Sequence, residues 1–135
     1  MHRRISIVVV ALLLALMRPV VAQEETSAEA LAVAQPGERV ALERDTIAQY
    51  GTQTRFEVTI TWDASAGARP ATYRPRAVRY VADCQAATLM LVAVGVFDSS
   101  GQLMKSLILP PGAADPITPA AGTQEHKWLK EVCGR

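Results

Sequence analysis

The chain has 135 residues, of which 50% are hydrophobic, 20% charged and 5% aromatic, and its formal net charge at pH 7 is +1. This length suits one domain with a single hydrophobic core. A nearly neutral chain gives no electrostatic reason to bind the negatively charged backbone of DNA or RNA, so we predict no nucleic-acid partner.

Residues 1–22 have the three parts of a secretory signal peptide. A basic start with Arg3 and Arg4 precedes an almost wholly apolar run over residues 5–17, and small residues then stand before a cut at Gln23. As a helix this run would be about 20 Å long, whereas the hydrocarbon core of a membrane is about 30 Å thick. We therefore predict that the segment is cleaved and that the chain has no membrane span.

The predicted mature chain has no lipid anchor either. A lipoprotein needs a cysteine at the cut, and the nearest cysteine is Cys84. Removal of the signal peptide leaves 11 of the 14 basic side chains against 13 acidic ones, and a single histidine, His126. We expect an exported protein that is periplasmic or secreted.

The mature chain begins with a segment that differs in composition from the rest. Residues 23–37 are rich in Ala and Glu and contain a Pro-Gly pair, which favours a short helix or a mobile lead-in. We expect the domain itself to cover residues 38–135 and to begin with a strand over residues 39–43. A helical turn should follow, because Asp45 can cap it and Gly51 suits its left-handed exit.

The clearest strand of the sequence covers residues 53–63. One alternating set of side chains is apolar, aromatic or β-branched: Thr54, Phe56, Val58, Ile60 and Trp62. The side chains between them are polar or charged. Strict alternation of this kind is typical of an antiparallel strand that buries one face. A loop over residues 64–76 follows, with one glycine and two prolines.

Three more strands are predicted, over residues 77–84, 88–97 and 102–109. In the second of them both alternating sets are apolar, so we expect a central strand that is covered on both faces. Residues 98–101 read Asp-Ser-Ser-Gly and predict a hairpin turn to the third strand. Four prolines then favour an extended connection over residues 110–122.

The last element is predicted to be a short helix. Thr123 suits its N-cap, and Glu125 suits its positive end. The 3.6-residue period places four side chains on one stripe: Trp128, Leu129, Val132 and Cys133. The predicted fold class is therefore α+β, an antiparallel meander sheet with a C-terminal helix packed on it.

The two cysteines, Cys84 and Cys133, both belong to the predicted mature chain. An exported protein meets an oxidising compartment, where an even number of cysteines favours disulfide bonding. A zinc site would need about four ligands, and only His126 is available as a histidine. A catalytic thiol would need a nearby base, but His126 precedes Cys133 by two helical turns, about 10 Å along the axis. We predict a structural Cys84–Cys133 disulfide, with no metal and no cofactor.

The order of the elements and three short motifs carry a resemblance to a known family. The motifs are Asp83-Cys84, the Phe97–Gly101 hairpin and the terminal Cys133-Gly134. From about Glu38 to Gly134 the chain resembles the bacterial surface-adhesin protein E-like family. The resemblance implies a compact α+β domain and the Cys84–Cys133 disulfide. Founding members are surface proteins that bind host matrix proteins, and they carry the lipid-attachment cysteine that this chain lacks.

Four arginines cluster around the loop before the third predicted strand and are the candidate binding residues: Arg69, Arg74, Arg76 and Arg79. Such a cluster can form a patch for an acidic protein partner. Arginines are common on protein surfaces, however, and charges also protect sheet edges. We favour this simpler interpretation of a solvated loop.

No set of side chains in the sequence predicts catalysis. Trp62 and Trp128 are expected in the core, and His126 is expected on the surface of the last helix. No nucleophile, base and orienting group occur together, and no glycine-rich phosphate loop is present. We predict a non-enzymatic binding module for protein–protein interaction in the cell envelope or at its surface. The alternative is an inhibitor or accessory factor of an envelope enzyme that presents residues 110–122.

Overall fold

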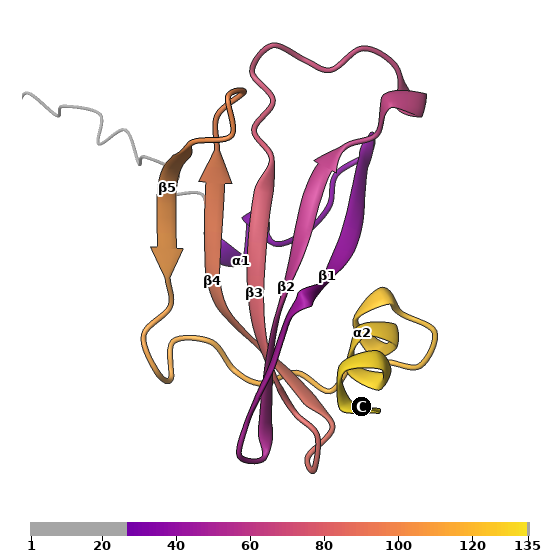
Figure 1. Ribbon diagram of the computed structural model, residues 1–135, viewed down its shortest axis with the longest axis vertical. Coiled ribbons are helices and arrows are strands. Elements are labelled where there is room, and N and C mark those ends of the chain that lie inside the picture. The colour runs from indigo at the N-terminus through magenta and orange to yellow at the C-terminus, as the bar shows by residue number, and fades with distance from the viewer. Residues whose placement is uncertain (1–26, 135) are drawn as a thin grey trace, which may run out of the picture.

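The computed structural model describes residues 27–134, which form one five-stranded antiparallel sheet with two helices. The strands follow one another in chain order, so the sheet is a meander (Figure 1). The predicted α+β fold class is confirmed. The predicted signal peptide lies outside the described residues.

The described elements differ in length. The helices are α1 (Ala28–Leu31) and α2 (Gln124–Cys133), with a 3-10 turn over Ala64–Ala66. The strands are β1 (Glu38–Tyr50), β2 (Gln53–Trp62), β3 (Arg76–Asp83), β4 (Thr88–Phe97) and β5 (Leu103–Ile108).

The prediction of a helical turn at Asp45 is wrong, because β1 continues through that segment to Tyr50. A bulge separates the Glu43–Glu57 pair from the Ala48–Arg55 pair. The Thr46 hydroxyl donates to the Glu43 carbonyl (2.6 Å) and accepts from the Glu57 amide (2.9 Å). It thereby satisfies backbone groups that the bulge takes out of the regular ladder.

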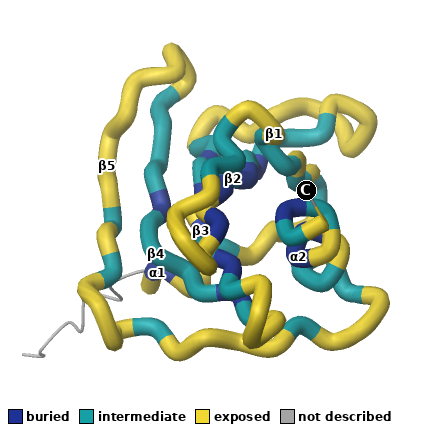
Figure 2. The backbone as a smooth tube through the Cα atoms, turned by 60° about the horizontal axis from the view of Figure 1, so that its bottom comes forward, coloured by how far each residue is buried: buried dark blue, intermediate teal, exposed yellow. Residues whose placement is uncertain are grey.

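The core lies between the sheet and α2. Phe56 of β2 is fully buried, and its ring stacks on Tyr80 of β3 with 5.6 Å between centroids. Trp128 of α2 contacts both rings, at 6.4 Å from Phe56 and 5.8 Å from Tyr80. The alternating pattern predicted for β2 and the apolar stripe predicted for α2 therefore meet in one aromatic cluster. In Figure 2 the backbone of β2, β3 and α2 is dark blue at buried positions.

The prediction that β4 is covered on both faces is wrong. Leu89 and Val94 are buried on the face that the helices cover, whereas Ala93 and Gly95 are only half-buried. Within residues 27–134, the helices of the protein lie on one face of the sheet. Ala93 and Gly95 on this second face of β4 are small, and Phe97 lies beside the exposed Leu103, so this face is an open surface rather than a second core.

The hairpin predicted after β4 is confirmed. Asp98 accepts hydrogen bonds through one carboxylate oxygen from the Ser100 and Gln102 amides, at 2.9 Å each. Gly101 has φ +84°, a conformation that few other residues adopt without strain. The hairpin connects β4 to β5. β5 is an edge strand of the sheet and pairs with β4 alone.

The C-terminal helix is fixed at both ends. Thr123 caps its start by accepting a hydrogen bond from the His126 amide (3.2 Å), as predicted. Near its end, Cys133 forms a disulfide with Cys84, just after β3, with 5.5 Å between the Cα atoms. A helix of ten residues would be marginal alone. Its buried stripe and the disulfide hold it on the sheet.

We expect replacement of both Cys84 and Cys133 by Ala to lower the free energy of unfolding by about 4 kcal/mol, because the disulfide closes a loop of about 50 residues. Urea denaturation of the oxidised wild type and the variant would measure the difference. Reductant should destabilise the wild type and leave the variant unchanged. Equal unfolding midpoints for the two proteins would contradict the structural role of the bond.

Candidate functional site

The four candidate arginines do not lie on one surface. Arg69 is exposed, with its guanidinium carbon 5.3 Å from the centre of the Tyr73 ring. Arg74 donates to the Tyr73 carbonyl (3.0 Å) and is half-buried. Arg79 is exposed on the open face of the sheet and pairs with Glu57 (3.1 Å). A binding role for these three arginines stays a prediction.

Arg76 is buried, so the expectation that it lies in a solvated loop is wrong. Its guanidinium forms a two-pronged ion pair with Glu38, with N–O distances of 2.8 and 2.9 Å. The side chains of Arg76 and Glu38 are only 10% and 2% exposed. Arg76 is thus committed to the interior and is not available to a partner.

The same guanidinium also reaches α1. Its Nε donates to the Leu31 carbonyl (2.6 Å), and one terminal nitrogen donates to the Val33 carbonyl (3.3 Å). These carbonyls lie at the end of a short helix, where backbone acceptors lack partners within the helix. Arg76 therefore joins β3, the start of β1 and the end of α1.

Glu38 is held ionised by its surroundings. Burial by itself would raise its pKa, but hydrogen bonds from Arg76, Tyr73 and the Gln35 amide outweigh this and keep the pKa below the ordinary value of 4.5. The Tyr73 hydroxyl donates to Glu38 at 2.6 Å, and burial together with this carboxylate raises the pKa of Tyr73. Every polar group of the cluster has a partner, which suits a structural role better than a chemical one.

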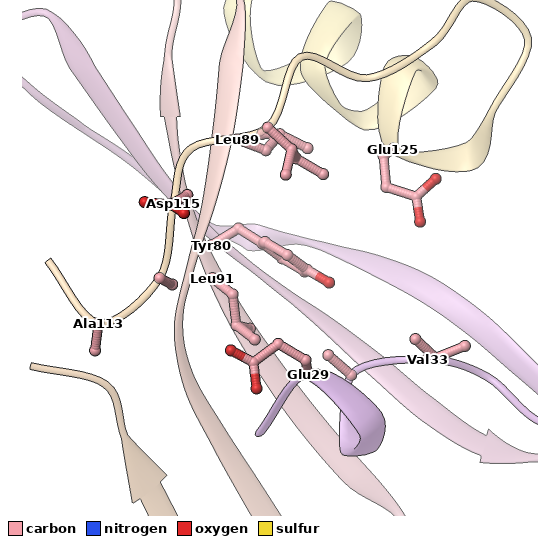
Figure 3. A pocket seen from close by; sticks show the side chains of 11 residues that line it. Glu29, Val33, Tyr80, Leu89, Leu91, Ala113, Asp115 and Glu125 are labelled. Carbon is pink, nitrogen blue, oxygen red and sulfur yellow. The ribbon is translucent and has the colours of Figure 1, made fainter. Parts of the chain in front are cut away.

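A cavity of about 340 Å³ opens on the helix-covered face (Figure 3). Its floor is apolar and includes Leu89 and Leu91 of β4 and Tyr80 of β3. Acidic side chains line its rim, and they come from three segments far apart in the sequence: Glu29, Asp115 and Glu125. Sequence analysis missed this cavity, because no local pattern indicates that these segments meet.

A second feature is an apolar strip on the open face, formed by Phe97, Leu103 and Ile108. The Cβ that a side chain at Gly95 would add lies 3.2 Å from Leu103 and 3.4 Å from Phe97, so these two side chains close over the glycine. Leu103 and Ile108 are 57% and 76% exposed. We call these three side chains the β5 strip. A hollow of about 220 Å³ lies beside it.

The proline-rich segment does not project freely over its whole length. Ile117 pairs with Leu89 at the start of β4 through two backbone hydrogen bonds of 2.9 and 2.8 Å. Residues 113–117 are thereby held beside the cavity, and they form one of its walls. The alternative of an inhibitor that presents this segment stays a prediction.

Residues 27–134 contain neither a cluster of metal-ligating side chains nor a helix that could span a membrane. No three of their His, Cys, Asp or Glu side chains lie close enough to hold a metal ion. None of the helices in this part of the chain has the length and apolar character needed to cross a bilayer.

We expect Arg76→Met to lower the free energy of unfolding by about 3–5 kcal/mol, because it leaves the Glu38 carboxylate buried without its partner. Arg79→Met is the matched control, since it removes an arginine from an exposed pair and should cost at most about 1 kcal/mol. Urea denaturation of both variants gives the comparison. Similar losses of unfolding free energy in the two variants would contradict a structural role for the Arg76–Glu38 pair.

The low pKa of Glu38 predicts a loss of stability in acid. A carboxyl group with a lower pKa in the folded state stabilises the fold above its unfolded pKa, and this contribution disappears as pH falls through the folded pKa. Glu38→Gln should therefore be less stable at pH 7 and should lose less further stability than the wild type between about pH 5 and 3. Thermal melts across this range would test it, and parallel curves for the two proteins would refute it.

Comparison with known families assigns the fold to one of them. A family model described as surface-adhesin protein E matches residues 29–134, from the second residue of α1 to the residue after α2. No curated protein and no solved structure matches the chain. The match begins earlier than the resemblance stated from Glu38, and it includes most of α1, which Arg76 holds in place. The chain belongs to the surface-adhesin protein E family.

Proposed function

We propose that this protein is an exported, non-enzymatic binding module that recognises another protein at its β5 edge. Membership of the surface-adhesin protein E family supports binding at or outside the cell surface. The signal peptide expected over residues 1–22 supports export, to the periplasm or the medium. The observation that carries the proposal is the exposed apolar edge of the sheet.

β5 has the features of a strand that can accept a further strand. It pairs with β4 alone, so within residues 27–134 its outer backbone groups face no other strand. Native proteins usually protect such an edge with charges, prolines or a covering element, but β5 has one charged residue, Lys105, and no proline. Strand addition to an edge of this kind is a common way of binding an extended peptide.

The side chains of β5 offer the specificity that a backbone edge lacks. Ile108 is 76% exposed and Met104 is 58% exposed, and the β5 strip continues from the edge onto the open face. Figure 2 shows β5 as the most exposed strand, in contrast to β2 and β3. We therefore propose that the ligand is an extended segment of a partner protein whose apolar side chains pack on the β5 strip.

This function predicts that Ile108→Lys weakens binding by at least about tenfold, because it places a charge in the apolar contact. The binding of purified protein to an immobilised basement-membrane extract would be measured by surface plasmon resonance. Tyr50→Lys is the control, since Tyr50 is 60% exposed but belongs to β1, at the opposite edge. It should bind within about twofold of the wild type.

Two results would count against the proposed function. One is an Ile108→Lys variant that binds as well as the Tyr50→Lys variant. The other is a wild-type protein that shows no saturable binding to the extract. Because both positions are exposed, circular dichroism and thermal melting should confirm that each variant folds before binding is compared.

A further inference from the structure

The cavity on the helix-covered face combines an apolar floor with an acidic rim. It lies between α1, the start of α2, β4 and residues 113–117 (Figure 3). Its volume, about 340 Å³, is at the lower end of the range for ligand pockets. The floor residues Leu89 and Leu91 suit the methylene groups of a ligand. A cavity of this size suits one long side chain better than a large cofactor.

The rim carries three negative charges without a compensating positive one. Glu29 comes from α1, Asp115 from the proline-rich segment and Glu125 from the first turn of α2. No lysine, arginine or histidine lines the cavity, and within residues 27–134 none of the three carboxylates forms an ion pair. Like charges around one opening repel each other, so a cation placed between them is favoured.

Tyr80 supplies an independent observation, a hydroxyl without a partner in residues 27–134 that points into the cavity. Its side chain rises from β3 into the cavity, with Glu29 and Glu125 on either side (Figure 3). The residue is only 8% exposed, and no hydrogen bond joins its hydroxyl to another group of residues 27–134; since no fully buried polar side-chain atom there lacks a partner, this hydroxyl is open to the cavity. A tyrosine hydroxyl that opens into an apolar cavity is a polar handle for a ligand group that enters there.

The Tyr80 hydroxyl stays protonated at neutral pH. Burial, with a smaller contribution from the charge of Glu125, raises the pKa of Tyr80 to about 12. A neutral phenol can accept a hydrogen bond through its oxygen while donating another. It is therefore suited to a ligand N–H group that enters between the carboxylates.

We propose that this cavity binds an arginine side chain presented by another polypeptide. The aliphatic stem would lie on Leu89 and Leu91, and the guanidinium would donate to the Tyr80 hydroxyl and to the rim carboxylates. The acidic groups are spread around the opening and do not converge on one point, so they form no metal-binding cluster in residues 27–134. A guanidinium spreads five N–H donors over three nitrogens and so suits separated acceptors better than an ammonium group, whose three donors share one nitrogen.

This site is separate from the β5 strip and does not depend on the function proposed for it. The cavity opens on the helix-covered face, whereas Leu103 and Ile108 lie over the opposite face. A patch for an acidic partner would have rested on the four arginines, whose side chains are dispersed in the structure. The cavity favours a basic partner group.

The test uses the exported protein with its disulfide intact and a blocked tripeptide, acetyl-Gly-Arg-Gly-amide. Titration followed by amide chemical shifts should give saturable shifts at Glu29, Leu91 and Ile117, with a dissociation constant on the order of millimolar. The matched ligand replaces Arg with citrulline, which has nearly the same shape but no charge. It should produce no saturable shifts at these amides.

Variants of the protein locate the interaction. Glu125→Gln and Tyr80→Phe should each weaken binding of the arginine peptide about three- to fivefold, since each removes one polar contact while keeping the packing. Asp45→Asn is the control for charge, because Asp45 is an exposed carboxylate of β1 outside the cavity. Ile108→Lys is the control for the β5 strip. Neither control should change binding by more than about 1.5-fold.

Three outcomes would overturn the inference. Equal shifts with the citrulline peptide would show that charge is not recognised. An effect of Asp45→Asn as large as that of Glu125→Gln would indicate general attraction to an acidic surface. Shifts that remain linear up to the highest peptide concentration, or that map outside the cavity, would exclude a site there. If Glu125→Gln and Tyr80→Phe lose the arginine peptide but still bind the basement-membrane extract, the cavity acts independently of the β5 edge.

Discussion

The buried Arg76 guanidinium is the interaction on which the N-terminal half of the domain depends. It pairs with Glu38 at the start of β1 and donates to backbone carbonyls at the end of α1. A four-residue helix has too few internal hydrogen bonds to persist alone. α1 therefore owes its position to this arginine and to the burial of Ala28 in the core. Breaking this ion pair would leave a buried charge without a partner. The pair is therefore strongly favoured once the sheet has formed.

The Cys84–Cys133 disulfide has the corresponding role for α2. It joins the end of the helix to the residue that follows β3, while Trp128 packs on Phe56 and Tyr80. The two helices are thus fixed to the same sheet by different means, one by an ion pair and the other by a covalent bond. The cavity lies between them, and residues 113–117, which pair with β4 through Ile117, form a further wall. Such support is what a recognition site needs to keep its shape before a ligand arrives.

The two faces of the sheet have different characters. The helix-covered face contains the aromatic core, and the other face is shallow, with small residues on β4 and exposed apolar side chains on β5. An apolar edge that no other described element covers favours aggregation of an isolated protein. In a protein that binds an extended partner, the same edge can pair with the partner's strand. This asymmetry agrees with membership of a family of surface adhesins. It also explains why the doubly apolar pattern of β4 did not mean burial on both sides.

The sequence by itself determined the features that depend on local periodicity and on compartment. The alternation around Phe56 predicted β2, and the stripe around Trp128 predicted the buried side of α2. Two cysteines in a chain expected to be exported predicted their bond. Only the tertiary structure decided which distant groups meet. Arg76 looked like a surface arginine, because its partner Glu38 lies 38 positions away. Asp45 and Gly51 carried helix signals, yet strand pairing and the Thr46 hydroxyl made a bulge instead. The rim of the cavity also gathers carboxylates from three segments. Local sequence sets which face a side chain occupies, but strand register and the docking of short helices set its neighbours.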